Sequence, residues 1–331
     1  MYLLKILNAK TCGDLFTNDP ARAKIEYKAM VKEIHPDICK DERADEAMKK
    51  LNVLYEQATD CFASHMWTES NRVVLTEKLG KSISIKYRAK TEFELGTRYV
   101  CDLAVCYVFK PEARRFAENA VKQIKSLRYK DDKMKQEMAR FMPEIKIDAE
   151  STDGSRILVL GKTADIMPLD LVLKECGDLI DARHAAWMIS RLCNLSCYLS
   201  HRNLSHNGLT PFNLFVSPQY HSIVLLGGWW YTVPIGTKMI GTTKDVYKNM
   251  PTVTKTSKCG HQTTDFEAIK AAGRMLTQGK SVPDAMERWL NAGSPDSALE
   301  LFKRWDKALD QAFGKREFIK LEIDPAQIYK E

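Results

Sequence analysis

The stretch LSHNGLTPFNLF, residues 204–215, separates a long predicted helix from a predicted β-hairpin, and this order decides how most of the chain can fold. The helix is predicted over 181–201, where Ala186, Ile189, Cys193 and Cys197 share one face. The short apolar runs NLFV and SIVLL that follow are typical of paired strands. Upstream, alternating or β-rich patterns predict strands at 82–89, 99–110 and 156–162, with helices at about 112–127 and 132–142.

Strands with one or two helices, followed by a helical half with a small hairpin, is the order of a protein-kinase-like fold. Residues 188–216 resemble the kinase segment that leads into the catalytic loop. In the pattern H-R-D-L-x-x-x-N-L-L, His206 stands at the H and Asn213 at the N. The stretch beginning Thr264-Asp265-Phe266 resembles the kinase helix whose buried Asp holds the backbone of that loop. The resemblance implies an α+β bilobal domain, with a small lobe over 81–165 and a large lobe over 166–325.

Two carboxylates of the kinase pattern are missing. In kinases one Asp receives the proton of the substrate hydroxyl, and the Asp of D-F-G binds magnesium. Gly208 stands at the first position and Gly227 at the second. We therefore predict a pseudokinase that is not an enzyme, in which His206, Asn213 and Asp265 are structural. Trp229-Trp230 is expected to fill part of the vacated cleft.

The phosphate-anchoring pair of a kinase has candidates here. Lys110, at the end of a predicted strand, fits the anchoring Lys, and Glu137 is the chosen partner, with Glu118 as the alternative. Two ordinary surface charges are an equal interpretation. We expect no metal and no cofactor, and weak nucleotide binding through Lys110, Glu137 and Asn213 stays open. The rival hypothesis is an atypical protein kinase or nucleotide-binding enzyme that uses a displaced carboxylate, such as Asp245 or Asp265.

The first 65 residues predict a helical hairpin. Asp19-Pro20 is a good helix start, because the Asp caps the helix and the proline needs no amide partner there. Pro36 should end this helix at His35, and a second amphipathic helix follows from about Asp41. Two such helices joined by a short loop pack antiparallel, which would expose the loop at the tip of the hairpin. The first helix carries an apolar face at Ala23, Tyr27, Met30, Val31 and Ile34 and a lysine stripe at Lys24, Lys28 and Lys32.

This hairpin resembles a J domain, the module of DnaJ-type co-chaperones, on Tyr27, Lys28, the His35-Pro36-Asp37 tripeptide and Leu51 to Asp60. In that family the tripeptide and the basic helix face engage Hsp70 and trigger its ATP hydrolysis. The resemblance implies an Hsp70-binding set: His35, Pro36, Asp37, Lys24, Tyr27 and Lys28. The Gly/Phe-rich segment and the CxxCxGxG repeats of other family members are absent, which indicates the divergent class. The alternative is a helical hairpin whose proline only ends a helix.

Together these patterns predict a multidomain chain, with an all-α J domain over 1–65 and a connector, partly helical, over 66–80 before the kinase-like domain. The predicted function is that of an Hsp70 co-chaperone whose kinase-like half is a scaffold for an unidentified protein client. Nine cysteines without a CxxC pair indicate reduced thiols and a cytoplasmic protein. No apolar run of about 18 residues occurs, so no membrane association is expected.

The net charge of +7 is concentrated in one region. Residues 81–140 hold 15 Lys and Arg against 8 Asp and Glu, a difference of +7. A solvated basic face explains this excess, because no aromatic residues are interleaved with a basic cluster. Nucleic acid is therefore not expected as a partner, and a nucleic-acid-binding adaptor is the third hypothesis.

Overall fold

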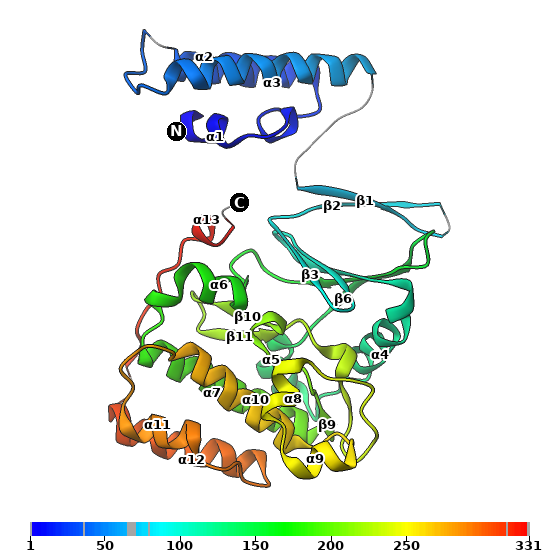
Figure 1. The fold of residues 1–331 in the computed structure, drawn as a ribbon, viewed down its shortest axis with the longest axis vertical. Coiled ribbons are helices and arrows are strands. Elements are labelled where there is room, and N and C mark those ends of the chain that lie inside the picture. Colours follow the sequence, from blue (N-terminus) through cyan, green and yellow to red (C-terminus); the bar gives the residue numbers. More distant parts are fainter. Residues whose placement is uncertain (1, 36, 65–70, 79, 316, 330–331) are drawn as a thin grey trace. The chain divides into compact units, whose positions relative to one another are not determined.

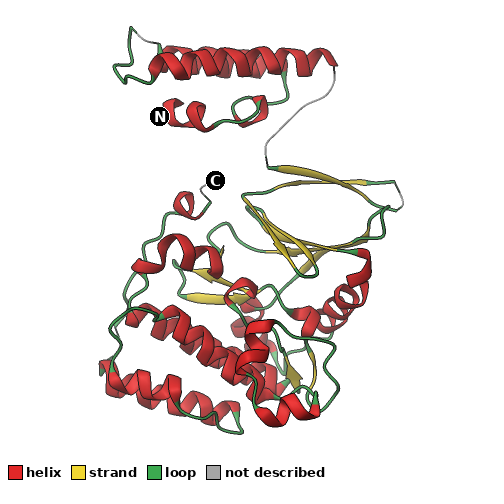
Figure 2. Cartoon of the chain, in the orientation of Figure 1, coloured by secondary structure: helices red, strands yellow, loops and turns green. Residues whose placement is uncertain are grey.

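The chain forms two compact units, Met1–Val74 and Leu75–Glu331 (Figures 1 and 2). The computed structural model describes residues 2–35, 37–64, 71–78, 80–315 and 317–329. The division between the units falls inside strand β1 (Arg72–Thr76). This part of the connector is therefore extended, which differs from the partly helical connector that the sequence predicts.

The first unit is a helical hairpin with a short helix packed on it. Its elements are α1 (Tyr2–Asn8), the 3-10 turn η1 (Cys12–Asp14), α2 (Pro20–Ile34) and α3 (Ala44–Ser64). The Asp19 carboxylate accepts the amide N–H of Arg22 at 2.9 Å, which confirms the predicted cap. Its core includes Ile6 from α1, Met30 and Ile34 from α2, and Leu51 and Leu54 from α3, all buried. The second helix begins at Ala44, three residues later than Asp41, whose side chain instead binds Arg43.

The second unit begins with a sheet of five antiparallel strands in the order β3-β4-β5-β7-β6. The β-rich run predicted over 99–110 is divided between two strands, because residues 101–103 interrupt it between β4 and β5. The strand predicted over 82–89 also divides, between β2 and the start of β3. The strands are β2 (Ser82–Lys86), which pairs with β1, and β3 (Ala89–Phe93), β4 (Gly96–Val100), β5 (Ala104–Phe109), β6 (Ile145–Glu150) and β7 (Arg156–Gly161).

Two helices lie between β5 and β6 in the sequence, α4 (Arg114–Lys125) and α5 (Asp132–Met138). They match the helices predicted at about 112–127 and 132–142, although the turn η3 (Ala139–Phe141) closes the second one. The buried face of α4, formed by Ala117, Ala120 and Ile124, belongs to the same core as the inner face of β5.

The rest of the chain is mainly helical. The long helix α7 (Ala182–His201) confirms the helix predicted over 181–201, and β10 (Leu214–Ser217) and β11 (Ser222–Leu225) form the predicted hairpin. Its helices are α6 (Leu169–Cys176), α7 (Ala182–His201), α8 (Lys244–Asn249), α9 (Thr252–Ser257), α10 (Gln262–Leu276), α11 (Asp284–Asn291), α12 (Ala298–Phe313) and α13 (Pro325–Ile328). Short elements complete it: η2 (Pro111–Ala113), β8 (Met167–Pro168), η4 (Gly177–Leu179), β9 (Leu204–Ser205), η5 (Pro211–Asn213), β10 (Leu214–Ser217), β11 (Ser222–Leu225), η6 (Trp229–Tyr231) and β12 (Val233–Pro234).

A sheet with a helix against it, followed by a helical lobe that contains one small hairpin, is the arrangement expected of a bilobal kinase-like domain (Figure 1). The prediction is confirmed at this coarse level, because the elements occur in the expected order. Among the described helices, none combines the length and the apolarity that a bilayer-spanning segment requires.

Candidate functional site

The loop after α7 is held by one buried carboxylate. Asp265, in the first turn of α10, accepts the amide N–H of His206 at 2.7 Å and that of Asn207 at 2.9 Å. The side chain of Asn207, whose φ of 57° is left-handed, donates to the backbone carbonyls of Ser205 and Tyr231. Burial raises the pKa of Asp265 to about 7, although its two N–H partners oppose that rise. The carboxylate of Asp265 is therefore occupied in holding the loop backbone.

Asn213 also faces into the loop. Its side-chain amide donates to the carbonyl of Gly208 at 2.7 Å and lies 3.3 Å from Thr210 Oγ1. The other side-chain atom, Oδ1, is buried and has no hydrogen-bond partner among the described residues. Asn213 thus links the end of the loop back to Gly208, and its side-chain NH₂ group is occupied by these contacts within the protein.

Of the positions of the two missing carboxylates, one is sterically closed and the other is tightly packed. A Cβ atom on Gly227 would lie 2.4 Å from Asn213 Oδ1 and 2.8 Å from the Tyr107 hydroxyl. A Cβ atom on Gly208 would lie 3.0 Å from a ring carbon of Tyr231. The first distance is shorter than any ordinary contact, so the packing requires glycine at 227.

Aromatic rings fill the space between the sheet and this loop. The Trp230 ring lies 4.9 Å from Tyr107, 5.3 Å from Phe109 and 5.5 Å from Phe93, measured between ring centroids. Phe93 also lies 5.5 Å from Phe212. Rings from β3 and β5 and from the turns η5 and η6 therefore form one cluster. Trp230 therefore lies between the lobes, whereas Trp229 packs on the His206 ring at 5.2 Å and donates to the carbonyl of Leu225.

A buried arginine crosses from the sheet to the helical lobe beside these rings. Arg98, on β4, is fully buried and binds both carboxylate oxygens of Asp170 on α6. Its Nη1 also donates to the carbonyl of Phe212 at 2.7 Å, and its guanidinium lies 4.0 Å from the centre of the Phe212 ring. A charge-assisted bidentate pair of this kind ties the two lobes together.

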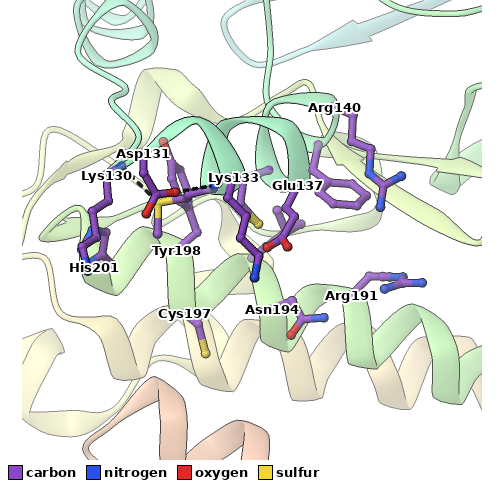
Figure 3. Close-up of a pocket in the computed structure, with 14 residues that line it drawn as sticks. Lys130, Asp131, Lys133, Glu137, Arg140, Arg191, Asn194, Cys197, Tyr198 and His201 are labelled. Carbon is purple, nitrogen blue, oxygen red and sulfur yellow. Dashed lines mark hydrogen bonds between the residues drawn. The ribbon is translucent and has the colours of Figure 1, made fainter.

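The structure does not bring Lys110 and Glu137 together. Lys110 is exposed just before η2, and it forms no ion pair with a carboxylate of the described residues. Glu137 is exposed on α5 and lines a separate hollow against α7 (Figure 3). The alternative partner, Glu118, pairs with Arg114 at 2.8 Å. The predicted Lys110–Glu137 pair is wrong, because α5 lies against α7 and directs Glu137 into that hollow, whose lining does not include Lys110.

Three residues of the cleft were missed in the sequence analysis. Tyr107 points inward from β5 between Val105 and Phe109, and strand alternation could have identified it. Asn119 on α4 donates to the carbonyls of Trp230 and Thr232, at 3.2 and 2.8 Å. No sequence signal marks Asn119 or the buried Arg98.

Neither of the displaced carboxylates proposed in the rival enzyme hypothesis lies in an open site. Asp265 is buried and is used as described above, and Asp245 is exposed in the first turn of α8. Within the described ranges, no group of three or more His, Cys, Asp or Glu side chains is placed to hold a metal ion.

The tip of the N-terminal hairpin presents His35 and Asp37, while Pro36 lies outside the described residues. His35 Nδ1 lies 3.3 Å from the amide nitrogen of Asp37 and 3.4 Å from its carboxylate. Lys24 and Lys28 are exposed on α2. Tyr27 instead stacks on Tyr55 of α3 at 4.2 Å and donates to Asn52, so it joins the two helices.

No family model and no curated protein matches this sequence. Among solved structures, the chain is similar to that of vaccinia-related kinase 3, with 13% sequence identity and a TM-score of 0.49. This similarity covers 75% of the present chain and 93% of the other.

The prediction that the chain is not an enzyme is wrong, because it derived the absence of any activity from two missing side chains. Glycines at 208 and 227 identify two absent carboxylates, and the absence of two groups does not exclude a reaction carried by others.

Proposed function

We propose that this protein is a cytoplasmic Hsp70 co-chaperone, in which the N-terminal hairpin is a J domain and the kinase-like domain binds a protein client. The observation that carries the proposal is the exposed His35–Asp37 tip beside a lysine stripe. The side chains of His35 and Asp37 are 45% and 86% exposed, so both are accessible to a partner.

The hairpin holds this tip in a defined turn. The amide N–H groups of Ile38 and Cys39 both donate to the carbonyl of His35, each at 2.8 Å. His35 has an extended backbone, with φ −55° and ψ 133°, as expected for a residue before proline. Tyr27 and Tyr55 join α2 to α3 below the turn, so the helices limit how far the loop can move.

The lysine stripe supports the proposal of a partner with an acidic surface. Lys24, Lys28 and Lys32 are spaced by four on α2, and all three are exposed. No ion pair with a carboxylate neutralises them within the described residues. The positive charges of such a stripe accelerate and orient the encounter with an acidic surface, and they contribute less to the final affinity.

The kinase-like domain supports the client-binding part of the proposal through its packed cleft. The rings of Trp230, Tyr107 and Phe93 and the Arg98–Asp170 pair make the space between the lobes part of the core. Binding of a protein would then use the outer surfaces of the domain. We assign no reaction to this domain.

The test is the rate of ATP turnover by a DnaK-type Hsp70 with the purified full chain added. The wild type should stimulate turnover, and His35→Gln should abolish the stimulation without changing the melting temperature. Gln57→Ala, an exposed change on α3 away from the tip, is the control and should stimulate like the wild type. A wild-type protein that leaves Hsp70 turnover unchanged would refute the proposal.

A further inference from the structure

A hollow lies between α5 and α7, on a side of the second unit that the cleft residues do not reach (Figure 3). Its volume is about 690 Å³. Apolar side chains contributed by α5, η3 and α7 form much of the lining: Met134, Met138, Phe141, Leu195 and Tyr198. Figure 3 shows Lys133 and Glu137 directed from α5 into the space above α7.

The walls of the hollow are fixed by packing and hydrogen bonds. Tyr198, buried on α7, donates its hydroxyl to the carbonyl of Arg128, and its ring stacks on Tyr129 at 5.7 Å. The Asp131 carboxylate caps α5 by accepting the amide N–H of Met134 at 2.8 Å. The α5 segment is therefore held on α7, and the hollow is present before any ligand arrives.

The rim of the hollow is predominantly basic. Four cations, Lys130, Lys133, Arg140 and Arg191, face two carboxylates, Asp131 and Glu137, which leaves +2 with His201 neutral. None of the four forms an ion pair with a carboxylate in the described part of the chain. One of the two carboxylates, Asp131, already serves as the helix cap.

Arg140 and Arg191 lie at the same end of the hollow, one from each wall (Figure 3). Arg140 stacks on the Phe141 ring at 4.7 Å, and Arg191 donates its Nε to the carbonyl of His221 at 2.8 Å. Burial, and then the charge of Arg140, lowers the pKa of Arg191. These two guanidinium groups, neither of which is paired with a carboxylate of the described residues, offer forked donors to an anionic group.

The hollow continues along α7. Arg191 and Asn194 also line a second space of about 470 Å³. Its charged lining holds three cations, Arg183, Arg191 and Lys315, and two carboxylates, Asp306 and Glu317, which leaves +1. Arg183 and Asn194 lie eleven positions apart, which is about 16 Å along a helix. This length exceeds what one small anion occupies, so the groove fits several residues of an extended chain.

We propose that this α7 groove binds an acidic peptide segment, with its apolar side chains on the α5–α7 floor and its carboxylates at Lys133, Arg140 and Arg191. This inference rests on the client-binding role proposed above and names the chemistry of the client. A nucleic acid fits less well, because it offers no aliphatic side chains to the methionine-rich floor.

The test is fluorescence anisotropy with a labelled peptide, Glu-Glu-Leu repeated four times, and the full chain. The wild type should bind this peptide at least about tenfold more tightly than the matching Lys-Lys-Leu peptide. Lys133→Glu/Arg140→Glu changes two exposed side chains and should weaken binding by about tenfold or more, whereas Glu137→Gln should strengthen it. The control Lys244→Glu/Lys248→Glu makes the same charge change on exposed positions of α8 and should bind like the wild type.

Equal binding of the two peptides, or equal loss in both double variants, would overturn the inference. Tighter binding of a labelled single-stranded DNA than of the acidic peptide would overturn it as well. His35→Gln should bind the acidic peptide normally. Failure of the peptide test is thereby separate from failure of the Hsp70 proposal, which is measured by ATP turnover.

Discussion

Arg98 and Asp170 form a bidentate ion pair between β4 and α6, with Nη1–Oδ1 at 3.1 Å and Nη2–Oδ2 at 2.7 Å. The arginine is fully buried, so its charge depends on this one carboxylate, with further hydrogen bonds to the carbonyl of Phe212 and the hydroxyl of Thr91. A buried charge that loses its partner is costly, because water cannot replace that partner.

Asp170→Asn should therefore lower the free energy of unfolding by about 3 kcal/mol, the low end for a broken buried pair, since Asp170 is partly exposed. Urea denaturation measures this change. Asp102→Asn is the matched control, because the Arg88–Asp102 pair is exposed on both sides and should cost less than about 1 kcal/mol. Equal losses in the two variants would show that Arg98 does not depend on Asp170.

The buried Asp265, which accepts the amide N–H groups of His206 and Asn207, should make the free energy of unfolding depend on pH. Burial raises its pKa to about 7 from an ordinary value of 3.8, so folding favours the protonated acid. Its stabilising contribution is complete below about pH 4 and is lost as pH rises to about 7. The stability difference between wild type and Asp265→Asn should shrink over this range in denaturation experiments.

Comparison with the variant isolates Asp265 from its neighbour. Burial lowers the pKa of His206 to about 3, which gives a stabilising contribution that is lost as pH falls from 6.5 to about 3. Both proteins retain His206, so its opposite trend cancels in the difference. A difference that is constant, or that grows with pH, would contradict the assignment.

Restoring the carboxylate at position 227 should damage the fold. Gly227→Asp places a Cβ atom against Asn213 and Tyr107, and overpacking of this kind costs about 1–3 kcal/mol. Gly293→Asp is the control, because that glycine is exposed and no atom lies within 4 Å of its added Cβ. Thermal denaturation should show a clear loss for the first variant only. Equal melting temperatures would mean that the packing at Gly227 relaxes easily.

Nucleotide should stabilise the protein little. Because Trp230, Tyr107 and Phe109 pack between the lobes, ATP with or without magnesium should raise the melting temperature by less than about 1 °C. Differential scanning fluorimetry measures this shift. A rise of several degrees that requires magnesium and disappears in Lys110→Ala would favour the atypical-enzyme hypothesis instead.

The lysine stripe should affect the rate of association with Hsp70. Lys24→Glu/Lys28→Glu reverses two exposed charges and should slow association by about tenfold or more at low salt. The difference from wild type should narrow at high salt, because salt screens exposed charges. Stopped-flow binding measures both rates. The control Lys244→Glu/Lys248→Glu makes the same charge change elsewhere and should associate like the wild type. Equal slowing in both double variants would mean that net charge, and not the lysine stripe, sets the association rate.

Local patterns predicted the elements that depend on periodicity. The apolar spacing along α7 and α2, and the cap at Asp19, report burial and backbone chemistry within a few residues. The loop register was also readable, and Asp265 lies against His206 and Asn207. The Lys110–Glu137 pair failed because charges at two element ends do not reveal which helix faces which strand.

The sequence by itself determined that two carboxylates are missing at Gly208 and Gly227, and that a His-Pro-Asp tripeptide follows an amphipathic helix. Only the tertiary structure decided what occupies the space between the lobes. Arg98 meets Asp170 across 72 positions and Phe212 across 114. Periodicity records whether a side chain is buried, whereas its partner depends on how distant segments pack, and that information is absent from any short stretch of sequence.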